Sequence, residues 1–262
     1  MNEKKRPSAP LFATCVLAAV FLFIYLPVIV MVFDSLVFEG VFSIEWYRQV
    51  FASRELLSAL QRSFIVGLLA SLVATALGTL ASIAITKNQG RLTRTLSSFS
   101  LFSLVIPELV FALALLSWFY ILKIPLSLFT VVVAHVTFSI SFVIMTVNGR
   151  ATGLDPAIED AGRDLGASEW LVLKKITLPL LGPAIVAGFL IGFLLSFDDF
   201  LISFYISGVG SDTLPIRLYA AMRAGLTPKL SALATIMLLI SALVILLIAQ
   251  ISIVKPRLNK KV

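Results

Sequence analysis

Six long stretches of the chain contain almost no charged residue, and this feature restricts the possible folds more than any other. The stretches are 11–33, 63–86, 96–122, 124–149, 176–197 and 230–254. Each exceeds the roughly 20 apolar residues that an α-helix needs to cross a bilayer. Together they contain one charged residue, Glu108. The pattern predicts an all-α, polytopic membrane protein with six transmembrane helices.

Composition agrees with this prediction. The 262 residues are 59% hydrophobic and only 13% charged, whereas about 25% of the residues of a soluble domain are charged. Because so apolar a chain could not cover a surface in water, soluble enzymes, nucleic-acid-binding domains and disordered chains are excluded. The single cysteine, Cys15, excludes an internal disulfide. We expect residues 1–262 to form one transmembrane domain that contacts lipid and no nucleic acid.

Lysine and arginine are distributed unequally between the two sides of the predicted membrane. The N-terminal segment, the loops after the second and fourth stretches, and the C-terminal segment hold 14 of these residues, and the opposite side holds 7. Cytoplasmic segments of membrane proteins are enriched in lysine and arginine. We therefore expect both termini to lie in the cytoplasm and the chain to reside in a bacterial inner membrane.

A short segment on the opposite side, 44–51, places its apolar residues at helical spacing. Such a pattern predicts an amphipathic helix at the outer membrane interface. This segment contains Trp46, for which there are two interpretations. The indole can anchor the helix among interfacial aromatic residues, or it can form a cation–π contact with a cargo at the pathway entrance.

The loop between the fourth and fifth stretches contains clear helix signals. Asp155-Pro156 predicts a helix start with aspartate as N-cap and proline at the first helical position. Gly166 is expected to end that helix, and Ser168 to cap a second one. Pro179 and Pro183 are expected to break the chain where it re-enters the membrane. The sequence thus predicts two short helices joined by a sharp corner.

The same loop carries apolar side chains, including Leu165 and Trp170, that are expected at its surface. They would suit either contact with lipid headgroups or contact with a protein partner. The loop also carries several acidic residues, such as Glu159 and Asp164, which an anionic leaflet would repel. This combination favours a docking surface for a protein.

The loop residues also resemble a known motif. The sequence Asp160-Ala161-Gly162, then Gly166, then Ile176 and Leu178-Pro179 is similar, at this spacing, to the EAA loop of ABC importer permeases. Aspartate replaces glutamate at 160, and glycine replaces the second alanine at 162. Glycine should loosen the helix by about 1 kcal/mol relative to alanine.

The resemblance implies a function for the loop, since in that family it lies in a cleft of the ATPase subunit and transmits its motion. It identifies a coupling loop at about 150–180. The residues assigned to coupling are Asp160, Ala161, Gly162, Gly166, Glu169, Ile176, Leu178 and Pro179.

The similarity extends over the whole chain. The runs 164–168, 196–199, 213–215 and 231–235 resemble the permeases of bacterial spermidine/putrescine importers, and of the two permeases in such systems the C-type is the more similar. The resemblance implies a type I ABC importer permease (MetI-like) fold. It also implies three kinds of partner: a dimer of ATP-binding subunits, a second, non-identical permease, and an external substrate-binding protein.

Three carboxylates near or within the apolar stretches point to the same cargo. An ionised side chain in a bilayer costs several kcal/mol, so it should face a pathway or a partner. No lysine or arginine in the stretches neutralises Glu108, Asp198 or Asp199. A polyamine carries ammonium groups on an apolar chain and would suit separated carboxylates. We therefore predict a substrate pathway containing these three residues, with Ser196 and Trp46.

Other roles for these residues stay open at this point. Each carboxylate can instead cap a helix, pack against one, or be protonated. Adjacent helical residues point about 100° apart, so one aspartate can face the pathway and the other the bundle. The single histidine, His135, is expected to be a hydrogen-bonded core residue, with a proton relay as the alternative.

We conclude from the sequence that the chain is a permease subunit of an ATP-driven importer that moves polyamines (spermidine/putrescine) by alternating access. It lacks a phosphate-binding loop and has one histidine, so we expect no cofactor or metal on this chain, and ATP with Mg²⁺ on the partner ATPase. One alternative is a permease of the same architecture for another cationic or small organic solute. The other is an intramembrane enzyme.

Overall fold

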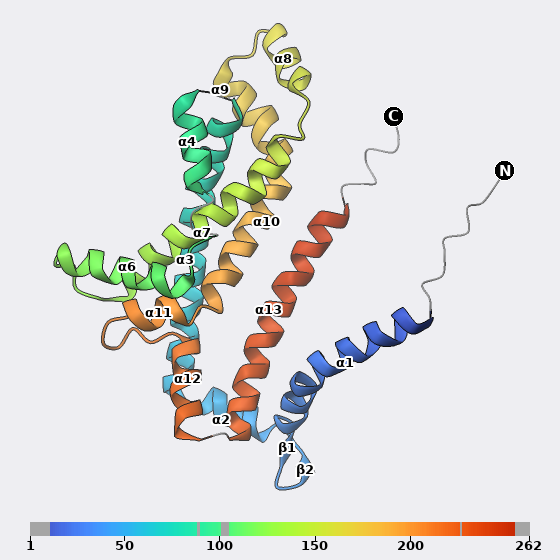
Figure 1. The fold of residues 1–262 in the computed structure, drawn as a ribbon, viewed down its shortest axis with the longest axis vertical. Coiled ribbons are helices and arrows are strands. Elements are labelled where there is room, and N and C mark those ends of the chain that lie inside the picture. Colours follow the sequence, from blue (N-terminus) through green and yellow to red (C-terminus); the bar gives the residue numbers. More distant parts are fainter. Residues whose placement is uncertain (1–10, 88–89, 101–104, 226, 255–262) are drawn as a thin grey trace.

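The computed structural model describes residues 11–87, 90–100, 105–225 and 227–254, and these form an elongated helical bundle (Figure 1). The helices of the first half are α1 (Leu11–Asp34), α2 (Glu45–Ala52), α3 (Arg54–Lys87), α4 (Arg91–Ser100) and α6 (Glu108–Ile121). Those of the second half are α7 (Leu128–Ala151), α8 (Pro156–Asp164), α9 (Glu169–Val172), the π-helical segment η1 (Leu173–Thr177), α10 (Leu178–Phe197), α11 (Leu201–Ile206), α12 (Leu214–Ala224) and α13 (Pro228–Val254). A two-residue antiparallel hairpin, β1 (Val37–Phe38) with β2 (Val41–Phe42), follows α1.

Five of the described helices are long and apolar enough to cross a membrane. They are α1, α3, α7, α13 and the continuous helix Glu169–Phe197, which comprises α9, η1 and α10. The all-α prediction is therefore confirmed, and five of the six predicted spans correspond to candidate membrane helices.

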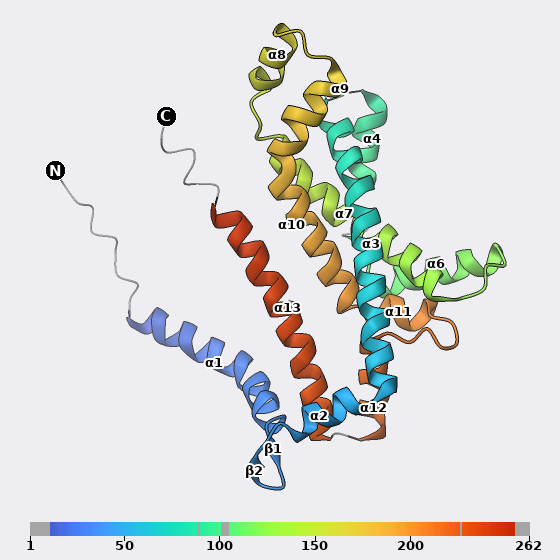
Figure 2. The ribbon, with the colours of Figure 1, turned by 180° about the vertical axis from the view of Figure 1, so that it is seen from behind.

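The predicted third span, 96–122, is not one continuous helix. α4 ends at Ser100, and α6 begins only at Glu108, directly after Pro107. Proline has no amide hydrogen and disfavours helical geometry in the residue before it, so a helix start at this point is expected. With 14 residues, α6 is about 21 Å long and shorter than the roughly 30 Å hydrocarbon core. Figures 1 and 2 show it extending sideways from the bundle.

Helices α3, α7 and α10 form the centre of the bundle and approach closely through small residues. The side chain of Val143 on α7 lies against Gly78 of α3 and Gly188 of α10. A Cβ atom on Gly78 would come within 2.8 Å of Val143 Cγ1, and one on Gly188 within 3.3 Å. These glycines permit close helix contact, as is common in membrane proteins.

The first helix lies apart from this centre. None of the apolar window of α1 is buried within the chain, and Figure 2 shows the helix leaning away from the bundle. Its C-terminal end is attached to α13, where the Ser231 hydroxyl donates a 2.8 Å hydrogen bond to Asp34. So exposed an apolar helix requires a hydrocarbon or protein environment outside this chain.

The predicted corner between the fourth and fifth stretches forms as expected at one end of the bundle (Figure 1). Asp155 caps α8 by accepting a 3.0 Å hydrogen bond from the Ala157 amide, and Ser168 caps α9. Between the two helices, Gly166 has a φ of +82°, a left-handed conformation that side chains with a Cβ disfavour.

The predicted break at Pro179 and Pro183 is wrong, because the helix runs without interruption from Glu169 to Phe197. Pro179 is the second residue of α10, which continues directly from η1, and Pro183 lies inside α10. The π-helical segment η1 directly precedes them. A wider π turn changes the hydrogen-bond spacing, so that the chain can pass the prolines without ending the helix.

Candidate functional site: an acidic cavity and a coupling loop

The three predicted carboxylates line one cavity, although they come from distant parts of the sequence. Its volume is about 470 Å³, and its lining residues are Glu108, Phe138, Leu194, Leu195, Asp198, Asp199, Phe200 and Leu201. Glu108 is the first residue of α6, and the two aspartates occupy the short break between α10 and α11. The cavity therefore combines negative charge with apolar and aromatic surface, and no lysine or arginine is among its described lining residues.

Asp199 is the buried member of the pair and is only 8% exposed. Its carboxylate accepts hydrogen bonds from the backbone amides of Ile202 (3.2 Å) and Ser203 (2.7 Å), so it caps the start of α11. It also lies 3.1 Å from Nε2 of His135 and lines the same cavity as Glu108. The capping alternative that the sequence left open therefore holds for Asp199.

Asp198 is exposed and has far fewer partners. Its only side-chain hydrogen bonds in the described part of the chain come from the Ser241 hydroxyl on α13, with distances of 3.0 and 2.9 Å to the two carboxylate oxygens. An ionised carboxylate has about four acceptor positions. Asp198 therefore retains the capacity to accept hydrogen bonds from a cation in the cavity.

Behind the cavity, a buried network joins three helices. His135 on α7 is 1% exposed, and its two ring nitrogens lie 2.5 Å from the Ser196 hydroxyl and 3.1 Å from the Asp199 carboxylate. The Ser203 hydroxyl is 3.2 Å from Nε2. The prediction that His135 is a hydrogen-bonded core residue is confirmed. Ser196 is buried in this network and does not line the cavity.

Trp46 is not among the residues that line the acidic cavity. Its indole nitrogen donates a 2.7 Å hydrogen bond to the Val37 carbonyl, and its ring packs edge-on against Phe38 with centroids 4.9 Å apart. The side chain thus ties α2 to the hairpin. This position fits the anchoring interpretation, and a contact between Trp46 and a cargo stays a prediction.

The coupling loop, α8 to η1, exposes an apolar surface at the opposite end of the bundle from α2 and α12 (Figure 1). Ile158 and Leu171 are each 44% exposed, Trp170 is 68% exposed and Leu165 is 89% exposed. Asp160 and Ala161 are also exposed. An exposed apolar patch of this kind marks a surface that another protein covers.

The motif residues Gly162 and Ile176 face inward and touch each other. A Cβ on Gly162 would lie 2.6 Å from Cδ1 of Ile176. The departure from alanine at 162 therefore has a packing reason, because the tip of Ile176 occupies the space of the missing methyl group. The expected loosening of α8 is offset by this contact.

Charged residues hold the two short helices together. Arg163 on α8 pairs with Asp160 at 2.6 Å on its own helix and with Glu169 at 2.6 Å across the Gly166 turn. It also lies 3.2 Å from Glu159. Glu169, predicted as a coupling residue, thus closes the corner. No local sequence signal marks Arg163 as the shared partner, because its role depends on the turn geometry.

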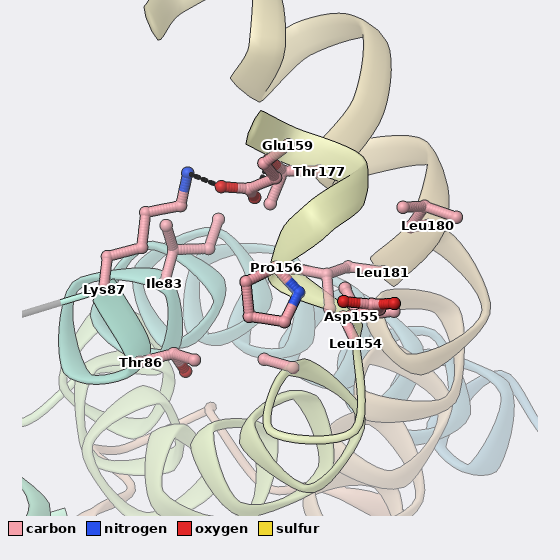
Figure 3. A pocket seen from close by; sticks show the side chains of 11 residues that line it. Ile83, Thr86, Lys87, Leu154, Asp155, Pro156, Glu159, Thr177, Leu180 and Leu181 are labelled. Carbon is pink, nitrogen blue, oxygen red and sulfur yellow. Dashed lines mark hydrogen bonds and ion pairs between the residues drawn. The ribbon is translucent and has the colours of Figure 1, made fainter. Parts of the chain in front are cut away.

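Glu159 connects the loop to the transmembrane helices. It pairs with Lys87 of α3 at 2.9 Å and accepts a 2.6 Å hydrogen bond from the Thr177 hydroxyl (Figure 3). Partial burial by itself raises the pKa of Glu159, but the Thr177 hydroxyl and the Lys87 ammonium outweigh it and lower the pKa below its usual value. Glu159 therefore stays ionised at neutral pH. The sequence analysis noted its charge but not these contacts.

Comparison with known proteins identifies the family. A family described as "Binding-protein-dependent transport system inner membrane component" matches residues 74–260. The chain is 37% identical to the spermidine/putrescine transport system permease protein PotC of Haemophilus influenzae over 87% of this chain and 91% of that protein. It is 33% identical to PotC of Escherichia coli K12 (88% and 89% covered) and 34% identical to the putrescine transport system permease protein PotI of the same strain (83% and 82%).

Solved structures with the same fold are more distant in sequence. A bacterial ABC transporter that imports the acidic polysaccharide alginate matches with a TM-score of 0.72 at 13% identity, over 92% of this chain and 94% of that chain. The MetNI methionine ABC transporter matches with a TM-score of 0.59 at 17% identity, over 77% and 93%. These matches support the predicted type I importer permease fold.

The family excludes the enzyme alternative, because its members are transport subunits, and ATP is bound by a partner ATPase. The Ser196–His135–Asp199 hydrogen bonds are therefore a structural network, not a catalytic triad. The family also implies an ATPase and a binding protein as partners. The chain belongs to the binding-protein-dependent transport system inner membrane components, and it is a multi-pass inner-membrane permease subunit of an ABC importer, related to the PotC and PotI permeases.

Proposed function

We propose that this permease carries polyamines, and that the acidic cavity is the cation-binding part of its pathway. The observation that carries the proposal is that Glu108, Asp198 and Asp199 line one cavity together with the aromatic rings of Phe138 and Phe200. Carboxylates bind ammonium groups through charge-assisted hydrogen bonds, and aromatic faces attract cations and methylene chains. The relatives named for spermidine and putrescine transport support the same cargo.

Within this proposal, the two aspartates have different roles. Asp198 is exposed and bonded only to Ser241 among the described side chains, so it meets the first ammonium group. Asp199 is held by α11 and His135, so it supplies a fixed negative charge at the cavity wall. Glu108 lines the same cavity from the start of α6 and is placed to bind a second ammonium group.

Transport then follows by alternating access, driven through the coupling loop. The exposed apolar residues of α8 and α9 dock on the ATPase, and the motif residues Asp160 to Pro179 transmit its movement to the bundle. A second, non-identical permease completes the pore, and an external binding protein delivers the polyamine. Gly166 and the Arg163–Glu169 pair keep the docking corner rigid.

We further propose six membrane crossings with both termini in the cytoplasm. Ile83 and Lys87 at the end of α3 and Ala151 at the end of α7 line one pocket beside the coupling loop. Because two successive long helices end on the same side, the chain between them must return across the membrane. This return lies between Lys87 at the end of α3 and Leu128 at the start of α7. The excess of lysine and arginine near both termini supports the same arrangement.

A transport assay with the assembled importer tests the cargo. The permease, its ATPase, the second permease and the binding protein are reconstituted, and uptake of labelled putrescine and spermidine is measured. Competition by unlabelled putrescine, choline, a neutral sugar and an amino acid distinguishes polyamines from other cationic or organic solutes. Competition by putrescine alone is expected. Uptake that only a non-polyamine solute inhibits would contradict the proposal.

Thiol labelling tests the orientation. In a variant that lacks Cys15, cysteines replace the exposed residues Gly153, beside the coupling loop, and Val209, in the loop before α12. An impermeant reagent added to spheroplasts should label position 209 and leave position 153 unlabelled until the membrane is opened. The reverse pattern would overturn the proposed topology.

A further inference from the structure

Among the acidic residues of the coupling loop, Glu159 is the one that points toward the transmembrane helices. Its side chain is 19% exposed, whereas that of Glu169 is 70% exposed. One carboxylate oxygen accepts the hydrogen bond from Thr177, and the other pairs with Lys87 and Arg163. A single side chain therefore contacts α3, its own helix α8, and the segment that leads into α10.

The positions of these partners allow the contacts to transmit movement from α8 to other helices. Lys87 is the last residue of α3, and Thr177 is the last residue of η1, directly before α10. The chain itself joins α8 to the end of α7 through the short link 152–155. Movement of α8 is therefore passed to α7 by covalent connection, and to α3 and α10 through Glu159.

Apolar packing does little to join α8 to α3 at this junction. A pocket of about 190 Å³ lies between the helices, with Ile83, Leu154, Pro156 and Leu181 among its lining residues. Figure 3 shows the Lys87–Glu159 pair bridging the side of this pocket above Pro156. Because the space beneath α8 is incompletely filled, the polar bonds of Glu159 are the main tie between α8 and α3.

We propose that Glu159 is a positioning residue for transport, which ties α8 to α3 and α10 so that displacement of the coupling loop moves the central helices together. The inference rests on the proposed coupling role of the loop. Glu159 touches neither the cargo nor ATP in this arrangement. Its loss leaves the docking surface in place but disconnects that surface from α3.

The test uses the whole importer in liposomes, with putrescine-free and putrescine-loaded binding protein as probes. Two quantities are measured: the stimulation of ATP hydrolysis by the loaded binding protein, and putrescine uptake per ATP hydrolysed. Glu159→Gln and Lys87→Met should each lower both by about two- to fivefold, the size expected for a partly exposed ion pair. Co-purification of the ATPase should be unchanged.

Three further variants make the result specific. The double variant should be no worse than either single variant, because both substitutions remove the same link. Lys87→Arg keeps the charge and should retain most of the coupling. Glu45→Gln is the matched control, since it removes a carboxylate that has no side-chain bond in the described structure and lies at the other end of the molecule.

Losses that simply add in the double variant, or an unchanged coupling ratio in Glu159→Gln, would overturn the inference. Failure of the unsubstituted permease to co-purify with the ATPase, or to respond to the binding protein, would contradict the proposed function instead. A variant that loses the ATPase altogether would assign Glu159 to docking and would also overturn the inference.

Discussion

The acidic cavity and the coupling loop both concentrate carboxylates, but they satisfy them in opposite ways. In the loop, Glu159, Asp160 and Glu169 are paired with Lys87 or Arg163. In the cavity, Asp198 is bonded by a serine hydroxyl, and Asp199 by a histidine and backbone amides. The loop carboxylates are thus paired with basic side chains of the same chain, whereas no lysine or arginine is among the described residues that line the cavity.

One polypeptide thus performs two tasks in separate regions. Internal ion pairs fix the shape of the loop, which suits the docking on the ATPase that we propose for it. An uncompensated carboxylate in a membrane is costly unless a cation reaches it, so the cavity is suited to a charged cargo. Substitutions in the two regions should therefore impair transport in different ways and to different degrees.

The largest effect is expected at the corner of the coupling loop. Gly166 has a φ of +82°, and a β-branched residue in that conformation costs about 1–3 kcal/mol. Gly166→Val should open the turn, separate Arg163 from Glu169 and reduce putrescine uptake to background, while the amount of permease in the membrane stays normal.

The matched control is Gly149→Val. Gly149 is exposed, has open space around its Cβ position and has no positive φ. It should transport almost normally. Wild-type uptake by Gly166→Val would show that transport does not require the turn at Gly166. It would also contradict the contrast between a rigid loop and a charged cavity.

The next effect concerns the charge in the cavity. Asp198→Asn keeps size and hydrogen bonding but deletes the charge, and the lost bond to an ammonium group is worth about 1.5–3 kcal/mol. Putrescine uptake should therefore fall about ten- to hundredfold. Asp198→Glu keeps the charge and should be milder.

Asp34→Asn is the control for this experiment, because Asp34 also accepts a hydrogen bond from a serine of α13 but lies outside the cavity. It should transport normally. If Asp198 only packs against α13, asparagine should serve as well as glutamate, and the ranking of the two substitutions would be reversed.

How far the sequence predicts these two regions depends on whether the signals are local. The cap at Asp155, the corner at Gly166 and the cap at Ser168 are read from neighbouring residues, and all three were correct. The division of the third span between α4 and α6 was missed, because charge-free composition does not reveal where a proline starts a helix.

Contacts between residues that are distant in the sequence cannot be predicted from local sequence signals. Nothing in the sequence pairs Lys87 with Glu159, or places His135 between Ser196 and Asp199, because these contacts arise only when α3, α7 and α10 pack together. The cost of charge in a membrane did identify Glu108, Asp198 and Asp199 as a group. It could not show that Asp199 is buried and Asp198 exposed.

The difference between the buried Asp199 and the exposed Asp198 should also appear in the stability of the bundle. His135→Ala removes a partner from both Ser196 and Asp199, and an unsatisfied buried polar group costs about 1–3 kcal/mol. The Tm of the purified permease in detergent should fall, whereas Asp198→Asn should leave Tm unchanged. Ser241→Ala serves as the control for loss of a hydroxyl near the cavity. An unchanged Tm in His135→Ala would mean that the network does not stabilise the bundle.

The smallest effect is expected where Gly162 meets Ile176. Alanine favours a helix interior over glycine by about 1 kcal/mol, but its methyl group would lie 2.6 Å from the tip of Ile176. The tip belongs to a flexible side chain, so the gain in helix propensity and the cost of the close contact nearly cancel. Gly162→Ala alone should therefore change Tm little.

Ile176→Val removes the carbon that would clash with the new methyl group, and when made alone it should lower the free energy of unfolding by about 0.5–1.5 kcal/mol. Combined with Gly162→Ala, it should cost less than that, because the new methyl group fills the vacated space. A double variant whose Tm loss equals or exceeds the sum of the single losses would show that Ile176 does not occupy the position of the missing methyl group.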